Sequence, residues 1–309
     1  MQLTKYRAFG KFRVIQMAVS LLSMLIYWGF SSGIFEILFN YNESSIDYNA
    51  QKAEQVRHDM LESSMYLSEY MNIQGYTTTI MFILMLTVLI LFYQEKNGLF
   101  TFRYVRGESQ KKVILSTIFQ YSWINALWYY IIYIIYLSIG YCIMGNRMEY
   151  IPRNTFDGIF GEGFSAASPY LYHMVQGIPS ILIGTFVYTL FGCVIALYCK
   201  KSYQALLWML GYFWGTQILL EFFRCTFLKQ QAGLAWFIGK FEPTFLYGFY
   251  GYVYHNPTIR TALQTMDSLI LPVLLSCVLL IIFFRKEEKI NAQQKIFHCT
   301  VYFYSICRL

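Results

Sequence analysis

Residues 76–113 read "YTTTIMFILMLTVLILFYQEKNGLFTFRYVRGESQKKV" and contain the two kinds of sequence from which this chain is built. The first eighteen residues, Tyr76–Tyr93, carry no charged side chain, whereas residues 95–113 form a short charged insert. After the insert, Ile114–Asn146 is again uncharged over thirty-three residues. An α-helix needs roughly 20 apolar residues to cross a bilayer core of about 30 Å. The stretch therefore predicts two membrane spans joined by a compact, basic connection.

The rest of the chain repeats this pattern of uncharged runs. Of 309 residues, 57% are hydrophobic and 13% are charged, and that charged share is about half the share in a soluble domain. Because hydrocarbon offers no water to the backbone, runs that cross a bilayer must be helical. We therefore expect an all-α membrane protein with six transmembrane helices, at Val14–Phe35, Tyr76–Tyr93, Leu115–Gly140, Ile178–Cys199, Ser202–Leu220 and Ser268–Phe284.

Basic residues are distributed unevenly between the two ends of these spans. With the N-terminus in the cytoplasm, 16 of the 24 Lys and Arg residues fall on the inner side, but only 4 of the 17 Asp and Glu residues do. Since cytoplasmic loops are rich in Lys and Arg, both termini are expected to be cytoplasmic. Residues 1–289 would form a single transmembrane domain and residues 290–309 a cytoplasmic tail. The positive charge serves topology and contact with membrane lipid, and binding to nucleic acid is not expected.

The first span has one alternative, a cleaved signal peptide. A cleavable apolar region is only 7–15 residues long, whereas the uncharged run Val14–Phe35 has 22 residues. We interpret it as a retained span.

Two of the outer loops are expected to be structured. Residues 40–75 carry a stripe of side chains at spacings of three and four, which predicts a packed helix: Ala53, Val56, Met60, Ser64, Leu67 and Met71. The last outer loop, 224–267, contains "LAWFIGKFEPTFLYGFYGYVYHNP", whose uncharged pieces are too short to span. Short apolar segments are typical of re-entrant helices. We expect two of them here, with Gly239 and Pro243 near the bend.

The sequence brings no set of reactive side chains together. The four histidines lie in predicted loops or in the tail, and Ser165, which sits among glycines, has no histidine base in any span. Seven scattered cysteines lack metal-ligand spacing, although Cys142 and Cys225 both fall near the outer face, where a disulfide between them is an alternative. We expect no catalytic site, no metal site and no cofactor, so the chain is not expected to be an enzyme.

Two kinds of energy coupling are disfavoured by what the sequence lacks. Ion-coupled carriers keep ionisable groups near the middle of the membrane, whereas the predicted spans hold neutral polar residues such as Gln16, Asn125 and Thr189. No G-x-x-x-x-G-K-[ST] loop occurs, so the chain does not bind ATP in that way itself. A transport protein of this kind takes its energy from a partner.

The charged insert suits contact with such a partner. Gly107 breaks the chain, Glu108 suits a helix N-terminus, and the following helix runs without interruption into the span Leu115–Gly140. A stiff polar element continuous with a span transmits motion into the membrane. The expected contact residues are Arg103, Arg106, Glu108, Lys111 and Lys112. The alternative is a loop whose basic side chains only contact lipid headgroups.

Four segments occur in a characteristic order: "EKNGLFTFRYVRGESQKKVILS" (95–116), "ASPYLYHMVQGIPSILIGTFVYTLFGCVIALYCKKSYQALLWM" (167–209), "FEPTFLYG" (241–248) and "FFRKEEK" (283–289). In this order and spacing they resemble the type-2 ABC transporter permeases, especially the small six-span exporters of Gram-positive bacteria. The resemblance implies a coupling helix between spans 2 and 3, re-entrant helices before span 6 and a place in the bacterial plasma membrane. The loop between spans 3 and 4 and the tail depart from the family pattern.

The resemblance also implies a function. The chain would be the permease subunit of an ATP-driven exporter for an amphipathic or hydrophobic substrate, such as a peptide, a lipid or a drug. A separate ATPase subunit would bind ATP, and a second copy or a similar permease would complete the assembly. Close-packing faces for that dimer are offered by the pairs Gly29 and Gly33, and Gly211 and Gly215. The alternative is an ATP-independent membrane protein, either a carrier or a sensor partner.

Overall fold

The computed structural model describes residues 11–40, 50–71, 74–105, 107, 109–145, 160–161, 163–226 and 266–286. These residues form helices and short turns, with no strand among them. Six of the helices are long and apolar enough to cross a membrane: Phe12–Ser31, Tyr76–Gly98, Gln110–Met144, Pro169–Tyr198, Ser202–Phe223 and Asp267–Lys286. The prediction of an all-helical chain with six apolar spans is therefore confirmed.

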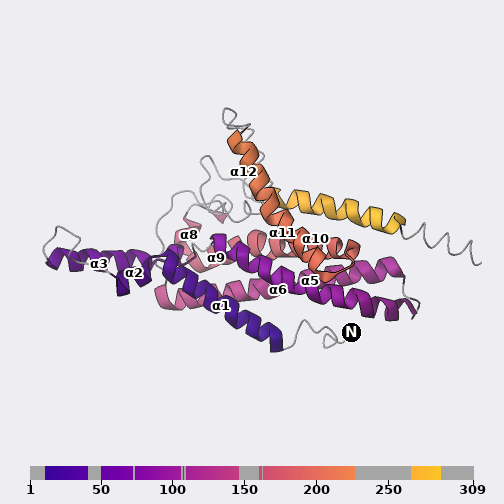
Figure 1. Cartoon of the computed structure of the whole chain (residues 1–309). Helices are drawn as coiled ribbons and strands as arrows, with labels where there is room; N and C mark the ends of the chain where they lie inside the picture. The colour runs from indigo at the N-terminus through magenta and orange to yellow at the C-terminus, as the bar shows by residue number, and fades with distance from the viewer. Residues whose placement is uncertain are drawn as a thin grey trace, which may run out of the picture.

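Three helices form the centre of the fold. They are α5 (Gln74–Val105), α6 (Gln110–Met144) and α10 (Gly184–Tyr198), and they lie side by side (Figure 1). Buried Leu, Met, Val and Tyr side chains from all three fill the space between them. Tyrosine hydroxyls in this core donate to backbone carbonyls, as when Tyr129 donates to Thr77 over 2.7 Å. Each such bond satisfies a hydroxyl that burial removes from water.

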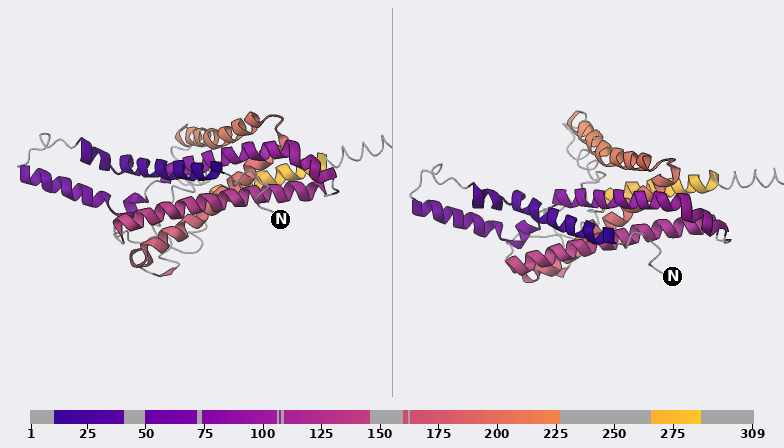
Figure 2. Two further views of the ribbon diagram at one scale, coloured as in Figure 1. Left: turned by 90° about the horizontal axis from the view of Figure 1, so that it is seen from below. Right: turned by 60° about the horizontal axis from the view of Figure 1, so that its bottom comes forward.

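Helix α1 (Lys11–Ser31) packs on this bundle and leads into α2 (Ile34–Phe39). The helix stops earlier than the predicted Phe35 because Gly33 has a φ of 72°, a left-handed conformation that favours glycine. Figure 2 shows the next helix, α3 (Ala50–Ser64), extending beyond the end of the bundle. The stripe predicted for this loop is divided, because Leu67 and Met71 are buried whereas Met60 is exposed. Leu67 belongs to the short helix α4 (Leu67–Tyr70).

The fourth span is longer than the sequence predicts. After the short α8 (Phe164–Ala167), α9 (Pro169–Gly177) begins with a proline, whose missing N–H costs nothing in a first turn. It continues through a π-helical segment, η4 (Ile178–Ile183), into α10, so that Pro169–Tyr198 is one helix. The prediction that residues up to 177 belong to a loop is therefore wrong for 169–177. His173 in particular is buried in α9.

The fifth span begins against α5 and α10, and its C-terminal part diverges from the bundle (Figure 1). It consists of α11 (Ser202–Leu210), a second π-helical segment η5 (Gly211–Gly215), and α12 (Thr216–Thr226). The last span, Asp267–Lys286, opens with the 3-10 turn η6 (Asp267–Leu269). It lies against α10, where Tyr188 donates to the carbonyl of Ser268 over 3.4 Å. Gly239 and Pro243, expected near a re-entrant bend, and the tail, 290–309, lie outside the described residues.

Candidate functional site

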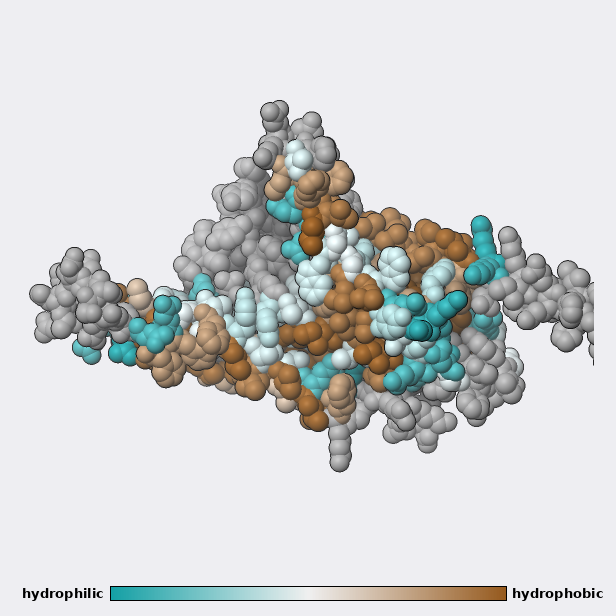
Figure 3. All heavy atoms as spheres, viewed as in Figure 1, coloured by the Kyte–Doolittle hydropathy of each residue, from teal (hydrophilic) through white to brown (hydrophobic). Residues whose placement is uncertain are grey.

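Basic side chains gather at one end of the bundle. Three contacts bring the helix ends together there: Tyr93 donates to the carbonyl of Lys200, Lys96 reaches the end of α10, and Lys111 lies over the ring of Phe284. Figure 3 shows hydrophilic side chains at this end and much hydrophobic surface beside it. We call the described basic residues at this end the basic rim: Lys96, Lys111, Lys112, Lys200, Lys201, Arg285 and Lys286.

Lys96 ties α5 to the end of α10. Its Nζ donates hydrogen bonds to the carbonyl oxygens of Ala196, Leu197 and Cys199, at 3.0, 2.8 and 3.0 Å. The last carbonyls of a helix have no partner within the helix, and a cation there also offsets the negative end of the helix dipole. The half-buried ammonium group therefore caps α10 from a neighbouring helix.

Helices α5 and α6 form a hairpin that extends past Lys96. Helix α5 continues unbroken to Val105, so residues 99–113, where the coupling helix is expected, are divided between the end of α5 and the start of α6. The break falls at Gly107, whose φ is 80°, as the sequence predicts. Helix α6 then starts at Gln110 and runs directly into the third span, which is also as predicted.

The five proposed contact residues lie around this break. Lys111 and Lys112 are exposed in the first turn of α6. Arg103 belongs to the last turn of α5, and its side chain is not among those described. Arg106 and Glu108 lie outside the described residues. The structure thus brings the two lysines to the tip of the hairpin.

The hairpin is braced against two other spans. Besides the cap that Lys96 provides to α10, the Nζ of Lys111 lies 5.7 Å from the centroid of the Phe284 ring, a distance suited to a cation–π contact. Tyr198 of α10 in turn donates to the carbonyl of Leu279 in the last span. A displacement of the hairpin would therefore act on α10 and on the last span together.

A chain of polar side chains crosses the interior of the bundle. Arg13 of α1, which is 3% exposed, donates to the amide oxygens of Gln16 at 3.1 Å and of Asn125 at 3.3 Å. Asn125 donates to the hydroxyl of Thr189 over 3.0 Å, and Gln16 donates to the hydroxyl of Thr87 over 2.9 Å. We call these five residues the polar chain. It joins α1, α5, α6 and α10.

Two members of the polar chain, Thr87 and Asn125, lie near the middle of α5 and α6, whereas Arg13 and Gln16 lie in the first turns of α1. At 1.5 Å per residue, Thr87 is about 14 Å from Lys96 along α5, and Asn125 is about 21 Å from Lys111 along α6. A bilayer core about 30 Å thick that begins at the basic rim would have its midplane between these values. A charged side chain at such a depth is costly and is commonly kept for function.

Arg13 is an ionisable residue whose buried position the sequence did not predict. The sequence places Arg13 ahead of the first apolar run, whereas the structure buries it inside the bundle. One signal was available, since Gln16, Asn125 and Thr189 interrupt apolar runs and buried polar groups need partners. Their meeting point was not predictable, because the residues come from three separate helices.

The two glycine pairs differ in their surroundings. Gly29 is packed within the chain, because a Cβ there would lie 2.5 Å from the Phe35 ring. Gly33 lies in the left-handed turn after α1, so it does not share a helix face with Gly29. Gly211 and Gly215 lie in the middle of the fifth span, and a Cβ at either would meet no atom of the described residues within 4 Å. Of the two pairs, the second has the open face that a partner requires.

The remaining candidates from the sequence stay apart from the basic rim. The Nδ1 of His173 lies 3.2 Å from Oε1 of Gln176, its neighbour in the same helix. Ser165 is buried in α8. Cys142 and Cys225 are both free thiols, so the structure does not contain the alternative disulfide.

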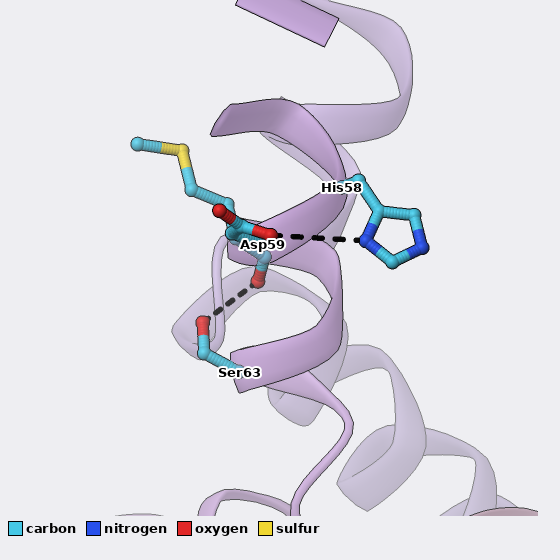
Figure 4. Close-up of polar contacts among 4 residues, drawn as sticks. His58, Asp59 and Ser63 are labelled. Atoms are coloured by element: carbon cyan, nitrogen blue, oxygen red, sulfur yellow. Dashed lines mark hydrogen bonds and ion pairs between the residues drawn. The ribbon is translucent and has the colours of Figure 1, made fainter. Parts of the chain in front are cut away.

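One surface cluster has the donor types of a metal site. His58, Asp59 and Glu62 of α3 hold their ligand atoms within 4.8 Å of one another. Figure 4 shows His58 beside Asp59, with 3.9 Å between Nδ1 and Oδ1, while Ser63 turns away to the carbonyl of Met60. The side chains of His58 and Asp59 are 77% and 66% exposed. Exposed groups of this kind are common without an ion, so we assign no metal to them.

No protein-family model matches this chain, and no curated protein or solved structure was found to be similar to it. Its class therefore rests on the fold. Six apolar helices of sufficient length define a multi-pass helical membrane protein. Any narrower function has to be argued from the basic rim and the polar chain.

Proposed function

We propose that this chain is the permease subunit of an ATP-driven exporter of the type-2 ABC class, in a bacterial plasma membrane. The observation that supports this most is the α5–α6 hairpin braced against α10 and the last span by Lys96 and Lys111. A partner that moved the hairpin would move several spans at once. A loop that only contacted headgroups would have no need of such bracing.

In this proposal the partner ATPase binds and hydrolyses ATP, and the chain itself catalyses no reaction. The tip of the hairpin, with Lys111 and Lys112, would enter a groove on the ATPase together with Arg103, Arg106 and Glu108. Helices α5 and α6 are 32 and 35 residues long and unbroken. Rigid elements of that length would carry a displacement from the tip to the far end of the bundle.

The proposed substrate is amphipathic or hydrophobic, such as a peptide, a lipid or a drug. Within one chain, buried Tyr, Leu and Met side chains fill the space between α5, α6 and α10. We therefore assign the transport path to the interface between two copies, or between this chain and a similar permease. The open face at Gly211 and Gly215 is the proposed contact.

Charge reversal at the hairpin tip tests the coupling. Arg106→Glu combined with Lys111→Glu should reduce copurification of the ATPase, and transport-stimulated ATP hydrolysis, by at least about tenfold. Like charges at a complementary interface cost several kcal/mol, and about 1.4 kcal/mol already corresponds to tenfold. The matched control is Arg285→Glu with Lys286→Glu, which reverses two exposed charges on the same rim that belong to the last span and not to the hairpin.

The result that would overturn the proposal is a hairpin variant that still copurifies with an ATPase and still transports. Equal losses in the control would assign the effect to the charge of the whole rim. An adjacent gene that encodes an ATPase with a phosphate-binding loop would support the proposal before any experiment on the protein.

An ATP-independent carrier is the second candidate, and Arg13 favours it. Intramembrane ionisable groups are common in ion-coupled transporters, and Arg13 is buried against Asn125 in the interior of the bundle. Vesicles that contain the purified chain alone distinguish the two functions. Substrate movement driven by an ion gradient, and abolished by Arg13→Gln, would establish the carrier; no movement without ATPase supports the permease.

A further inference from the structure

A cavity of about 650 Å³ lies at the basic rim, between the end of α10, the start of α11 and the last span. Ligand pockets commonly measure roughly 300–1,000 Å³. The residues that matter for its chemistry are Tyr198, Cys199, Lys200, Gln204, Trp208 and Leu279. They include no member of the polar chain and no residue of the hairpin tip.

One end of this cavity is basic. Lys200 lines it and is exposed, and Lys201 follows in the same turn. Gln204 fixes that turn, because its Oε1 accepts hydrogen bonds from the backbone N–H groups of Lys200 at 3.0 Å and Lys201 at 3.2 Å. The ammonium group of Lys96 lies 3.0 Å from the carbonyl oxygen of Cys199, a lining residue. The described lining includes no acidic side chain that would neutralise these cations.

The other end is apolar and open to the outside of the bundle. Trp208 is 67% exposed and Tyr198 is 41% exposed, while Leu279 contributes an aliphatic wall from the last span. Trp and Tyr are enriched at the depth of lipid headgroups, where an apolar ring and a polar tip are both accommodated. The cavity therefore changes from basic to apolar along its length.

We propose that this cavity is a binding site for an anionic phospholipid of the leaflet that borders the basic rim. The phosphate group pairs with Lys200, and an acyl chain lies along Trp208 and Leu279. Basic pockets between transmembrane helices are suited to anionic headgroups. Burial of the acyl chain against these apolar walls adds to binding.

The two ends of the cavity together select this class of ligand. A small soluble anion would meet the lysines but would leave the apolar walls without a contact. A zwitterionic lipid would fill the apolar end, but its own ammonium group would oppose the lysines. An anionic head with an acyl chain uses both ends. Such a lipid would also touch α10, α11 and the last span, and would hold these three helix ends together.

Native mass spectrometry of the detergent-purified chain, titrated with phosphatidylglycerol or phosphatidylcholine, tests the site. We expect one phosphatidylglycerol to be retained in preference to phosphatidylcholine. Lys200→Gln and Trp208→Ala should each weaken that retention at least about tenfold, and Lys200→Arg should preserve it. The controls are Lys112→Gln and Leu207→Ala, which alter exposed neighbours outside the cavity lining and should change retention less than about twofold.

Three results would overturn the proposal. Equal retention of phosphatidylcholine would show that the lysines do not select an anionic headgroup. An equal loss in Lys112→Gln would show diffuse attraction to the rim instead of a site. Full retention in both Lys200→Gln and Trp208→Ala would locate the lipid elsewhere.

Cys199 provides a second readout that belongs to this cavity alone. It lines the cavity, whereas Cys142 is exposed near the far end of α6. In single-cysteine variants, added phosphatidylglycerol should slow maleimide labelling at Cys199 at least about threefold and leave Cys142 unaffected. Unchanged labelling at Cys199 would contradict the proposal. Cys199 could also be protected without added lipid. If that protection disappears when residues 290–309 are removed, the occupant of the cavity is the chain's own tail.

Discussion

Asn125 accepts a hydrogen bond from Arg13 and donates one to Thr189, so it connects α1 to α10 through α6. Hydrogen bonds to charged groups contribute about 1.5–3 kcal/mol each. Asn125→Leu should therefore lower the free energy of unfolding by about 2 kcal/mol, because it removes an acceptor from a buried guanidinium group. Arg13→Met should cost less, since it also removes the charge that burial disfavours. Denaturant titration in detergent micelles measures both.

A double variant separates this interaction from simple loss of packing. Arg13→Met with Asn125→Leu should be more stable than the sum of the two single effects predicts. Both partners of the hydrogen bond are then absent, so neither is left buried without the other. Gln94→Leu, at an exposed position of α5, is the control and should change stability by less than about 0.5 kcal/mol. Additive effects of the two substitutions would show that Arg13 and Asn125 are not energetically coupled.

The thiol of Cys199 should respond to pH through its surroundings. Burial raises the pKa of Cys199 above its ordinary value, and the nearby Lys96 ammonium group lowers it by a smaller amount. Only the thiolate reacts, so the labelling rate should keep rising through the pH of about 8.5 at which a free cysteine is half ionised. Lys96→Met should move the midpoint higher still. Labelling rates from pH 7 to 10 test this, with the SDS-unfolded chain as the control; a folded midpoint at or below the unfolded one would contradict it.

At the scale of elements, two glycines test whether α5 is continuous and where the hairpin turns. Gly98 lies inside α5, and a Cβ there would meet nothing within 4 Å. Gly98→Ala should therefore stabilise the protein by about 0.5–1 kcal/mol, since alanine is the better helix former. Gly107 has a φ of 80°, so Gly107→Ala should cost about 1 kcal/mol. A destabilising Gly98→Ala, measured by thermal denaturation, would place a turn at residue 98.

The apolar spans were predictable because the bilayer imposes one length on every crossing helix. Their ends were less predictable, because a helix continues into water wherever its backbone bonds remain intact. Helix α5 thus passes Tyr93, the last residue of its apolar run, and ends at Val105. At the fourth span the start signal was Pro169, which suits a first helical turn, although eight residues of moderate polarity separate it from the apolar run.

The candidate site was predictable only in part. Lys111 and Lys112 lie at the tip of the hairpin because their position after Gly107 fixes them there. The roles of Lys96 and Arg13 depend on which helices become neighbours. Hydropathy indicates which residues lie within the membrane, but it does not indicate which helices lie beside one another. Contacts such as Lys96 with the end of α10 therefore required the structure.

At the scale of the whole molecule, the fifth span is one of the apolar segments that a single copy leaves exposed. Trp208, Trp214 and Ile218 are each more than half exposed. They flank Gly211 and Gly215, above which a single chain has open space. Small residues between large ones form a shallow groove that lets a second helix approach closely, which is how many transmembrane helices associate. We therefore expect the fifth span to lie at the seam between two copies.

Replacing Gly211 and Gly215 with leucine should fill that groove with little effect on the fold, because a Cβ at either position meets no atom within 4 Å in the described part of the chain. The variant should fold as stably as the original but dimerise at least about tenfold more weakly on native mass spectrometry. Gly192→Ala is the opposite control, since its Cβ would lie 2.9 Å from Leu89 inside the bundle. It should lower thermal stability and leave the monomer–dimer equilibrium unchanged. An unchanged dimer in the double leucine variant would remove the fifth span from the seam, and the transport path proposed between two copies would then need another interface.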